Sequence, residues 1–279
     1  MGTSQSEKAR AFRALHEGPG AFVMPNPWDV GTARILAGLG FSALATTSAG
    51  LAFALGRRDG EGAVSREEAL AHAGAIVAAT PLPVSADLEN GFGEAPERAA
   101  ETIRLAADAG LVGASIEDAT ADPERPIYDA SLAAERIAAA VDAARALPFP
   151  FTLTARGENF LHGRPDLDET IRRLQAFEAA GADVLYAPGL RDLAMIREVC
   201  RAVGKPVNVI MGLSGAPFSI DQLSAAGVRR ISVGSALSRT ALGAFLRAAR
   251  EIKECGTFTF AEGAASFAEI DPFMSGRAT

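Results

Sequence analysis

Short apolar runs alternate with longer amphipathic, alanine-rich segments along most of the chain. The short runs predict buried strands, and the longer segments predict helices that cover a sheet. We expect a helix at 6–16 and a further helix after each strand. The predicted strands are residues 21–24, 42–46, 84–86, 113–116, 151–155, 183–187, 206–210 and 230–233. Such alternation is typical of βα units and a parallel sheet.

Four glycines stand between the end of a predicted helix and the next strand: Gly40, Gly110, Gly181 and Gly227. Glycine at this place is typical of a left-handed helix cap, so the same αβ joint recurs. Eight strands, each followed by a helix, close naturally into a (β/α)8 barrel. A doubly wound open sheet is the alternative, but the glycine-rich first turn of that fold is missing.

The barrel is expected to span residues 1–254, with the turn after the second strand opening a long loop, 47–62. Residues 255–279 are loosely patterned, and we interpret them as an extension that packs on the barrel or on a neighbouring subunit. No glycine-free apolar run is long enough to cross a membrane, because the candidate at 35–55 is interrupted by glycines, serines and threonines.

Composition narrows the class of protein. The net charge of −7 without a basic run argues against a nucleic-acid surface. Cys200 and Cys255 are the only cysteines, too few for a disulfide framework or a zinc cluster. The N-terminus lacks the apolar core of a signal peptide. Together these features favour a cytoplasmic protein that binds a small molecule.

Acidic residues collect where the predicted strands end, which is where barrels place catalytic side chains. They are Asp59 after the second strand, Asp87 and Glu89 after the third, Glu117 and Asp118 after the fourth, and Glu158 after the fifth. Asp87 and Glu89 are two residues apart, so as strand residues they would project to the same side. So many carboxylates around one cavity need a cation. We therefore predict a magnesium site, with manganese as the alternative.

Two features of the same face suit an anionic substrate. The turn Thr47, Ser48 and Ala49 has small side chains and backbone N–H groups that can hold a carboxylate or an oxyanion, although it could simply connect two elements. Arg156 can grip a carboxylate with two hydrogen bonds or form a salt bridge to an acid of the ring. These residues predict a ligand that carries a carboxylate.

Proton transfer requires a further group. Tyr128 and His162 lie on the loops after the fourth and fifth strands, and Glu158 and Tyr186 are additional candidates. The alternative for His162 is that it is a surface residue without a catalytic role, as single histidines on loops often are. His16 and His72 fall in helices and are expected at the surface.

The motifs together resemble the isocitrate lyase and phosphoenolpyruvate mutase superfamily over residues 19–250. They are N-x-W-D at 26–29, T-S-A-G-L-A and L-G-x-x-D within 47–59, A-D-x-E-N-G-F-G at 86–93, S-I-E-D at 115–118 and T-A-R-x-E at 154–158. The resemblance implies a barrel that binds magnesium and a 2-oxo acid or its enolate, and that breaks or forms C–C or P–C bonds. It also implies exchange of the eighth helix between subunits, in dimers that pair into tetramers.

The resemblance also implies roles for individual positions. Asp87 matches the direct metal ligand, Glu89 replaces a second Asp, and Glu117 and Asp59 match outer acids. The turn residues Thr47, Ser48 and Ala49 match those that hold the pyruvyl group, and Arg156 matches the arginine that grips it. We count Trp28 among the substrate-binding residues, as a side chain that packs under the site. Asn208 joins this set because it lies near Ile210 and Gly212, which replace the family's Asn and Glu.

The loop after the fourth strand departs from the family. The lyases carry Lys-Lys-Cys-Gly-His there, whereas residues 119–129 contain no cysteine and no lysine. We therefore expect a magnesium-dependent lyase that breaks a C–C bond of a small 2-oxo or 2-hydroxy acid through an enolate, by decarboxylation or a retro-aldol step. Arg156, Glu117, Tyr128 and His162 are its candidate catalytic residues. The alternatives are a phosphonopyruvate-type mutase or hydrolase, and a non-catalytic barrel that binds a dicarboxylate.

Overall fold

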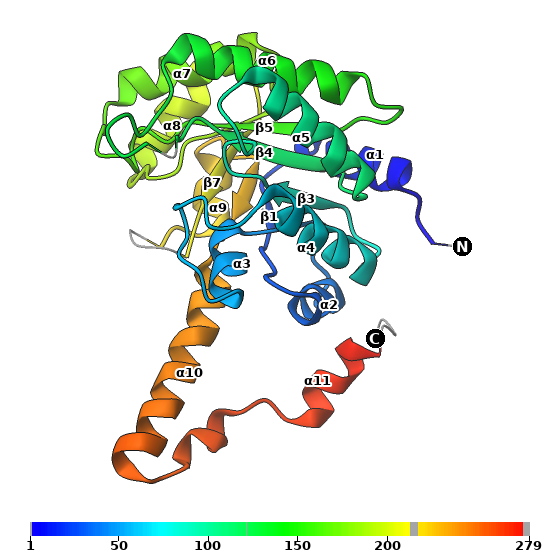
Figure 1. Ribbon diagram of the computed structural model, residues 1–279, viewed down its shortest axis with the longest axis vertical. Coiled ribbons are helices and arrows are strands. Elements are labelled where there is room, and N and C mark those ends of the chain that lie inside the picture. The colour runs from blue at the N-terminus through cyan, green and yellow to red at the C-terminus, as the bar shows by residue number, and fades with distance from the viewer. Residues whose placement is uncertain (1, 121, 213–216, 276–279) are drawn as a thin grey trace.

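Eight parallel strands form a nearly closed barrel with helices around it (Figure 1), in a computed structural model that describes residues 2–120, 122–212 and 217–275. Neighbours along the sheet follow the order β1-β8-β7-β6-β5-β4-β3-β2. The strands are β1 (Phe22–Met24), β2 (Leu44–Ala45), β3 (Val84–Asp87), β4 (Gly113–Glu117), β5 (Thr152–Arg156), β6 (Val184–Tyr186), β7 (Val207–Ile210) and β8 (Arg230–Ser232). The predicted (β/α)8 fold is confirmed.

Helices precede and follow these strands as the sequence pattern predicts. They are α1 (Gln5–Glu17), α2 (Val30–Gly38), α3 (Ser48–Ala54), α4 (Arg66–Ala79), α5 (Pro96–Asp108), α6 (Ala130–Arg145), α7 (Leu167–Ala179), α8 (Leu193–Ala202), α9 (Ile220–Ala225), α10 (Ala236–Cys255), the 3₁₀ helix η1 (Thr259–Gly263) and α11 (Phe267–Met274). Alanines on their inner faces pack on the strands, which lets helix and sheet approach closely.

Backbone and side-chain hydrogen bonds link β1 and β2, the two ends of the strand order. Ala45 donates its N–H to the carbonyl of Pro25 at 3.1 Å. The Asn26 side chain donates from Nδ2 to the Thr46 carbonyl at 2.9 Å, and its Oδ1 accepts from the N–H of Val233 at 3.0 Å. One amide side chain therefore joins the ends of β2 and β8 across β1.

The repeated joint is confirmed at all four glycines, whose φ angles are 85° at Gly40, 90° at Gly110, 98° at Gly181 and 101° at Gly227. Residues with a side chain rarely adopt this left-handed conformation. At Gly110 a Cβ would also lie 2.9 Å from Cγ1 of Val77 on the neighbouring helix. The same backbone solution thus lets four helices turn tightly into the next strand.

The prediction of a long loop after β2 was wrong in one respect. The chain forms the helix α3 almost immediately after the strand. Thr47 is its N-cap, with an extended backbone and a side chain that accepts a hydrogen bond from the N–H of Gly50 at 3.3 Å. A capping threonine satisfies one of the amide groups that a helix start leaves free. Ser48 and Ala49 therefore belong to a first helical turn.

His16 corrects a second expectation. Its side chain is buried at 6% exposure, and Nε2 lies 3.3 Å from Nη1 of Arg230 inside the barrel. Burial first, and then the charge of Arg230, lower the pKa of His16 to about 3. His72 is half-buried, and its Nε2 contacts the Trp28 carbonyl at 2.8 Å. α1 packs on the barrel, which a helical period alone does not show.

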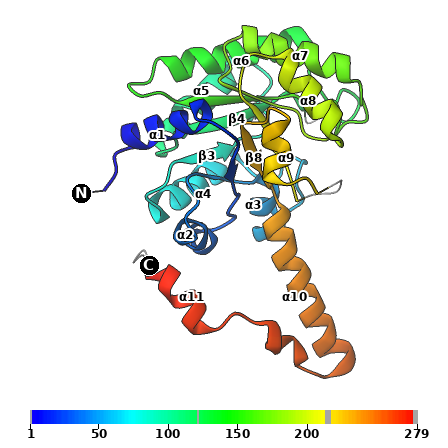
Figure 2. The same ribbon diagram turned by 180° about the vertical axis from the view of Figure 1, so that it is seen from behind.

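The C-terminal segment leaves the barrel. α10 projects away from it and exposes Phe245 and Leu246 at 68% and 50%, while α11 returns to lie against α2 (Figures 1 and 2). Arg34 of α2 donates to the Met274 carbonyl at 2.7 Å. Residues 276–279 of the predicted extension lie outside the described residues. Within those described, no helix is both long and apolar enough to cross a bilayer.

We expect Gly110→Ala to lower the free energy of unfolding by about 1–3 kcal/mol, because it forces a left-handed backbone on alanine. The matched control is Gly74→Ala within α4, where a Cβ would meet nothing closer than 3.6 Å. Alanine there should stabilise the helix by up to about 1 kcal/mol. Urea unfolding of both variants measures the difference, and equal effects would contradict the joint's role.

Candidate active site

Three neighbouring strands end in charged residues that face one cavity system. Asp87, Glu117 and Arg156 are the last residues of β3, β4 and β5, and Glu117 is paired with Arg156 in the parallel register. An outer cavity of about 1080 Å³ and an inner one of about 390 Å³ share Ser48, Asp59 and Arg156 in their walls. The site therefore lies at the C-terminal end of the barrel, as the fold requires.

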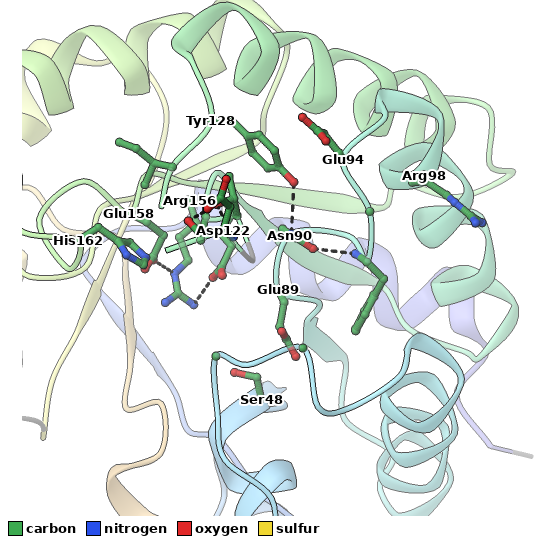
Figure 3. Close-up of a pocket in the computed structure, with 18 of the residues that line it drawn as sticks. Ser48, Glu89, Asn90, Glu94, Arg98, Asp122, Tyr128, Arg156, Glu158 and His162 are labelled. Atoms are coloured by element: carbon green, nitrogen blue, oxygen red, sulfur yellow. Dashed lines mark hydrogen bonds and ion pairs between the residues drawn. The ribbon is translucent and has the colours of Figure 1, made fainter. Parts of the chain in front are cut away.

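Arg156 lies at the centre of the acids. Its Nε contacts Glu158, and its Nη1 lies 3.2 Å from Oε2 of Glu117 and 3.7 Å from Oδ1 of Asp87. Figure 3 shows the guanidinium pointing toward Glu158. The ring of Tyr186 lies below it, with the guanidinium carbon 5.2 Å from the ring centroid. Arg156 thus forms ion pairs with three carboxylates, as the salt-bridge alternative expects. It also lines both cavities, so a carboxylate ligand could still bind it in competition with these acids.

Asp87 is held by the start of α3. The backbone N–H and the hydroxyl of Ser48 donate to its Oδ2 at 3.2 and 2.9 Å, and its own N–H donates to the Thr46 hydroxyl at 3.0 Å. The other oxygen, Oδ1, is buried and has no hydrogen-bond partner among the described residues. A buried carboxylate oxygen without a donor is costly, and a bound cation would satisfy it.

Glu89 reaches the cavity by a different route from the one expected. The strand ends at Asp87, and the backbone turns sharply because Glu89 and Phe92 have φ angles of 47° and 59°. The Glu89 carbonyl accepts from the N–H of Glu117 at 2.9 Å, which ties this turn to β4. Simple alternation along a strand was therefore wrong for this pair, although Asp87 lines the inner cavity and Glu89 the outer one.

The carboxyl groups of the site resist ionisation together. Burial, and then the charges of Asp87 and Asp59, raise the pKa of Glu89 to about 7. Burial and Asp87 also raise the pKa of Asp59, and burial raises that of Glu117 well above its ordinary value, although Arg156 opposes this shift. Five acids around one guanidinium leave an excess of negative potential, which attracts a cation.

Magnesium fits this donor set only with water in its shell. Across residues 2–120, 122–212 and 217–275, no group of three or more His, Cys, Asp or Glu side chains is arranged close enough to hold an ion directly. Magnesium retains several waters and needs few direct carboxylates. Oδ1 of Asp87 lacks a hydrogen bond, and the pKa values of Asp59 and Glu89 beside it are raised. Both observations fit such an ion.

Asp118 does not belong to the acidic ring. Its Oδ2 lies 3.1 Å from Nη1 of Arg173 on α7, and its Oδ1 accepts from the N–H of Glu158 at 2.7 Å. The same arginine donates to the Tyr128 carbonyl at 2.9 Å. Burial raises the pKa of Asp118 to about 6 despite these bonds. Its side chain fastens the loops after β4 and β5 to α7.

Tyr128 and His162 line the outer cavity, as Figure 3 shows. The Tyr128 hydroxyl accepts from Nδ2 of Asn90 at 3.4 Å. Nε2 of His162 lies 3.9 Å from Oε2 of Glu158 and its side chain is one-third exposed, at 33%. Both side chains therefore reach the space in front of the acids.

The remaining predicted residues divide between the inner cavity and its surroundings. Thr47 and Ala49 line the inner cavity beside Asn208, whose side chain donates to the Ser232 hydroxyl at 3.0 Å and accepts from Arg230 at 2.9 Å. Trp28 lines neither of these two cavities and sits next to α3, where a Cβ on Gly50 would lie 2.9 Å from its own Cβ. Trp28 therefore packs closely against α3 at Gly50.

Sequence reasoning missed several residues of the inner cavity. Ser85, Ser115 and Ser232 line it together with Arg230. Their signal was present in the alternation of polar and apolar residues along the strands, because inward positions recur every second residue. A barrel interior is more often filled with branched aliphatic residues. Polar residues at inward positions thus mark a cavity rather than a packed core.

Fold and site together define an enzyme of the (β/α)8 class with an acidic centre at its strand ends. The family model of phosphoenolpyruvate phosphomutase matches residues 12–253. The chain belongs to this family, within the superfamily of isocitrate lyases and phosphoenolpyruvate mutases. The resemblance predicted from the motifs is confirmed.

Three relatives illustrate the range of the family. A crystal structure from Burkholderia cenocepacia J2315, provisionally named a lyase/mutase, is 61% identical, covers 99% of each chain and has a TM-score of 0.95. The structure of 2,3-dimethylmalate lyase is 27% identical over 96% of this chain and 97% of that one, with a TM-score of 0.84. A probable 2-methylisocitrate lyase of Corynebacterium glutamicum is 29% identical over 92% of this chain and 85% of its own length.

We expect the metal-free protein to lose stability as the pH rises from about 4.5 through about 7, the range between the ordinary and the folded pKa of Glu89. A raised carboxyl pKa stabilises the fold only while the group is protonated. Glu89→Gln should therefore raise the melting temperature in EDTA more at about pH 8 than at about pH 5.5. Glu198→Gln on the exposed face of α8 is the control, and the same gain at both pH values would contradict the prediction.

Proposed function

We propose that this enzyme is a magnesium-dependent lyase that breaks a C–C bond of a small 2-oxo or 2-hydroxy carboxylic acid. The observation that carries the proposal is the convergence of Asp87, Glu117 and Arg156 from three adjacent strand ends on two cavities that share Arg156 in their walls. A carboxylate, an adjacent carbonyl and a metal ion are the parts of a ligand that such a site can hold. Family membership supports the same class of chemistry.

Asp87 would hold the magnesium ion directly, with Glu89, Glu117 and Asp59 acting through water. When bound, the ion supplies positive charge that stabilises the oxygen of an enolate as the neighbouring bond breaks. Ser48 and Glu117 keep the chain's own groups in place, since one holds Asp87 and the other holds Arg156. Arg156 lines both cavities and can orient an entering carboxylate.

Tyr128 and His162 are the proposed proton-transfer groups. Both line the outer cavity, on the side of the acids that the inner cavity does not reach. The hydroxyl of Tyr128 is held at 3.4 Å by Asn90, and the imidazole of His162 lies beside Glu158. A group that delivers a proton must come within hydrogen-bond distance of the substrate. Tyr128, on the loop after β4, and His162, on the loop after β5, both line the cavity in which a substrate would bind.

Turnover tests this proposal. Purified protein with Mg²⁺ should release pyruvate or carbon dioxide from a member of a panel of oxaloacetate, 2-methylisocitrate, malate-type acids and phosphonate acids. Asp87→Ala should abolish turnover, and Tyr128→Phe or His162→Gln should lower kcat by about 10²–10⁴-fold if that group transfers the proton. An unchanged affinity of Asp87→Ala for Mg²⁺, measured by the metal-dependent rise in melting temperature, would show that the metal assignment is wrong.

The panel also separates the alternative functions. Release or rearrangement of phosphate from a phosphonate would indicate a P–C mutase or hydrolase. If no acid is turned over while 2-oxo acids still raise the melting temperature with Mg²⁺, the protein is a binding barrel. The absence of lysine and cysteine from residues 119–129 argues against a lyase with the Lys-Lys-Cys-Gly-His loop.

We also propose that α10 packs against a second copy of the chain, in a homodimer or homotetramer. The apolar side chains of Leu242, Phe245 and Leu246 are exposed in the single chain at 41%, 68% and 50%. Exposed apolar area of this kind is typical of an interface. Light scattering should give a molar mass that is a multiple of 28.9 kDa. Phe245→Glu should lower it and Arg250→Glu should not, whereas a monomeric wild type would contradict the assembly.

A further inference from the structure

Arg136 on α6 is a buried arginine without an acidic partner. Only 1% of it is exposed, and no ion pair involves it within the part of the chain that the structure describes. A buried guanidinium is costly unless its N–H groups are satisfied. Within the described residues its side chain donates to the backbone carbonyls of one turn, those of Asn90, Gly93 and Glu94. The arginine is therefore used to hold a piece of backbone.

That turn is the one that carries Glu89 into the site. It contains Glu89 and Phe92, the two non-glycine residues of the described chain with positive φ. Residues in this conformation are strained and persist only where surrounding contacts fix them. Asn90 adds one such contact, because its Oδ1 accepts from the N–H of Phe92 at 3.0 Å. Arg136 adds three carbonyl contacts, one at Asn90 between the two strained positions and two directly after Phe92.

The same guanidinium touches the loop after β4. Its central carbon lies 4.4 Å from the ring centroid of Tyr128, within the range of a cation–π interaction. The Tyr128 hydroxyl in turn accepts from Asn90, so arginine, tyrosine and turn form a closed set of contacts (Figure 3 shows the Tyr128–Asn90 bond). Lysine could not reproduce this set, because it lacks the planar fork that bonds several acceptors while stacking on a ring.

We propose that Arg136 is a positioning residue that fixes the Glu89 turn and the Tyr128 loop in one common arrangement. Its loss lets both segments move, which displaces Glu89 from Asp87 and Tyr128 from the cavity. The part of this inference that concerns magnesium rests on the proposed function. The part that concerns the two loops rests on the contacts alone, so each can fail separately.

The variants Arg136→Lys and Arg136→Met test the proposal, and Arg145→Lys is the matched control. Arg145 is on the same helix and also binds a backbone carbonyl and a carboxylate, those of Gly181 and Asp183, but it contacts neither loop. The first readout is hydrogen exchange of the metal-free proteins. Peptides that cover residues 88–95 and 122–129 should both exchange faster in the Arg136 variants, while the control leaves them unchanged.

The second readout is the Mg²⁺ concentration that gives half of the metal-dependent rise in melting temperature. It should increase about tenfold or more in Arg136→Lys, the usual effect of removing a residue that orients a metal ligand. A lower melting temperature with unchanged exchange in either loop would overturn the common arrangement and leave a packing role. A Mg²⁺ midpoint within about twofold of wild type would overturn the link to the metal. If wild type shows no Mg²⁺ effect, the proposed metal function fails, and the exchange experiment still decides the role of Arg136.

Discussion

The sharing of one guanidinium by several carboxylates is the constraint on which the site depends. Arg156 faces Asp87 and Glu117, from the ends of β3 and β4, and Glu158, from the loop that follows β5. The parallel register sets Glu117 level with Arg156, and it sets Asp87 level with Ser115, two residues before Glu117. Burial raises the pKa of Glu117 well above its ordinary value although Arg156 opposes this shift, so one cation does not fully offset the burial of these acids. The positions of the charged groups in the site therefore depend on how the strands of the barrel pair.

Most of the fold and the position of the site could be predicted from the sequence. Strands and helices follow from hydrophobic spacing, and the recurring glycine joint follows from a conformation that glycine adopts easily. Once eight βα units are accepted, the strand-end rule selects Asp87, Glu117 and Arg156 without reference to distance. These are residues whose place is set by the backbone of a regular element.

Residues placed by irregular backbone or by tertiary contacts could not be predicted in the same way. Glu89 depends on a left-handed turn at a residue type that rarely adopts it, and no local pattern signals that. Asp118 faces α7 because Arg173 meets it there, a pairing between residues distant in sequence. His16 looked like a surface residue because helical spacing does not tell what a helix covers. In each case the deciding interaction is non-local.

The loop after β4 shows why the reaction is harder to infer than the site. Residues 119–129 form part of the outer cavity wall, through Thr120, Arg125 and Tyr128 among others. The loop lacks the reactive side chains of the lyases, yet Arg173 holds its Tyr128 carbonyl and Arg136 lies over the Tyr128 ring. Tyr128 is thus fixed both through its backbone carbonyl and through its ring, and this part of the cavity wall has a defined form. The acidic centre alone therefore does not identify the leaving group, because the chain departs from the lyases in this wall of the cavity.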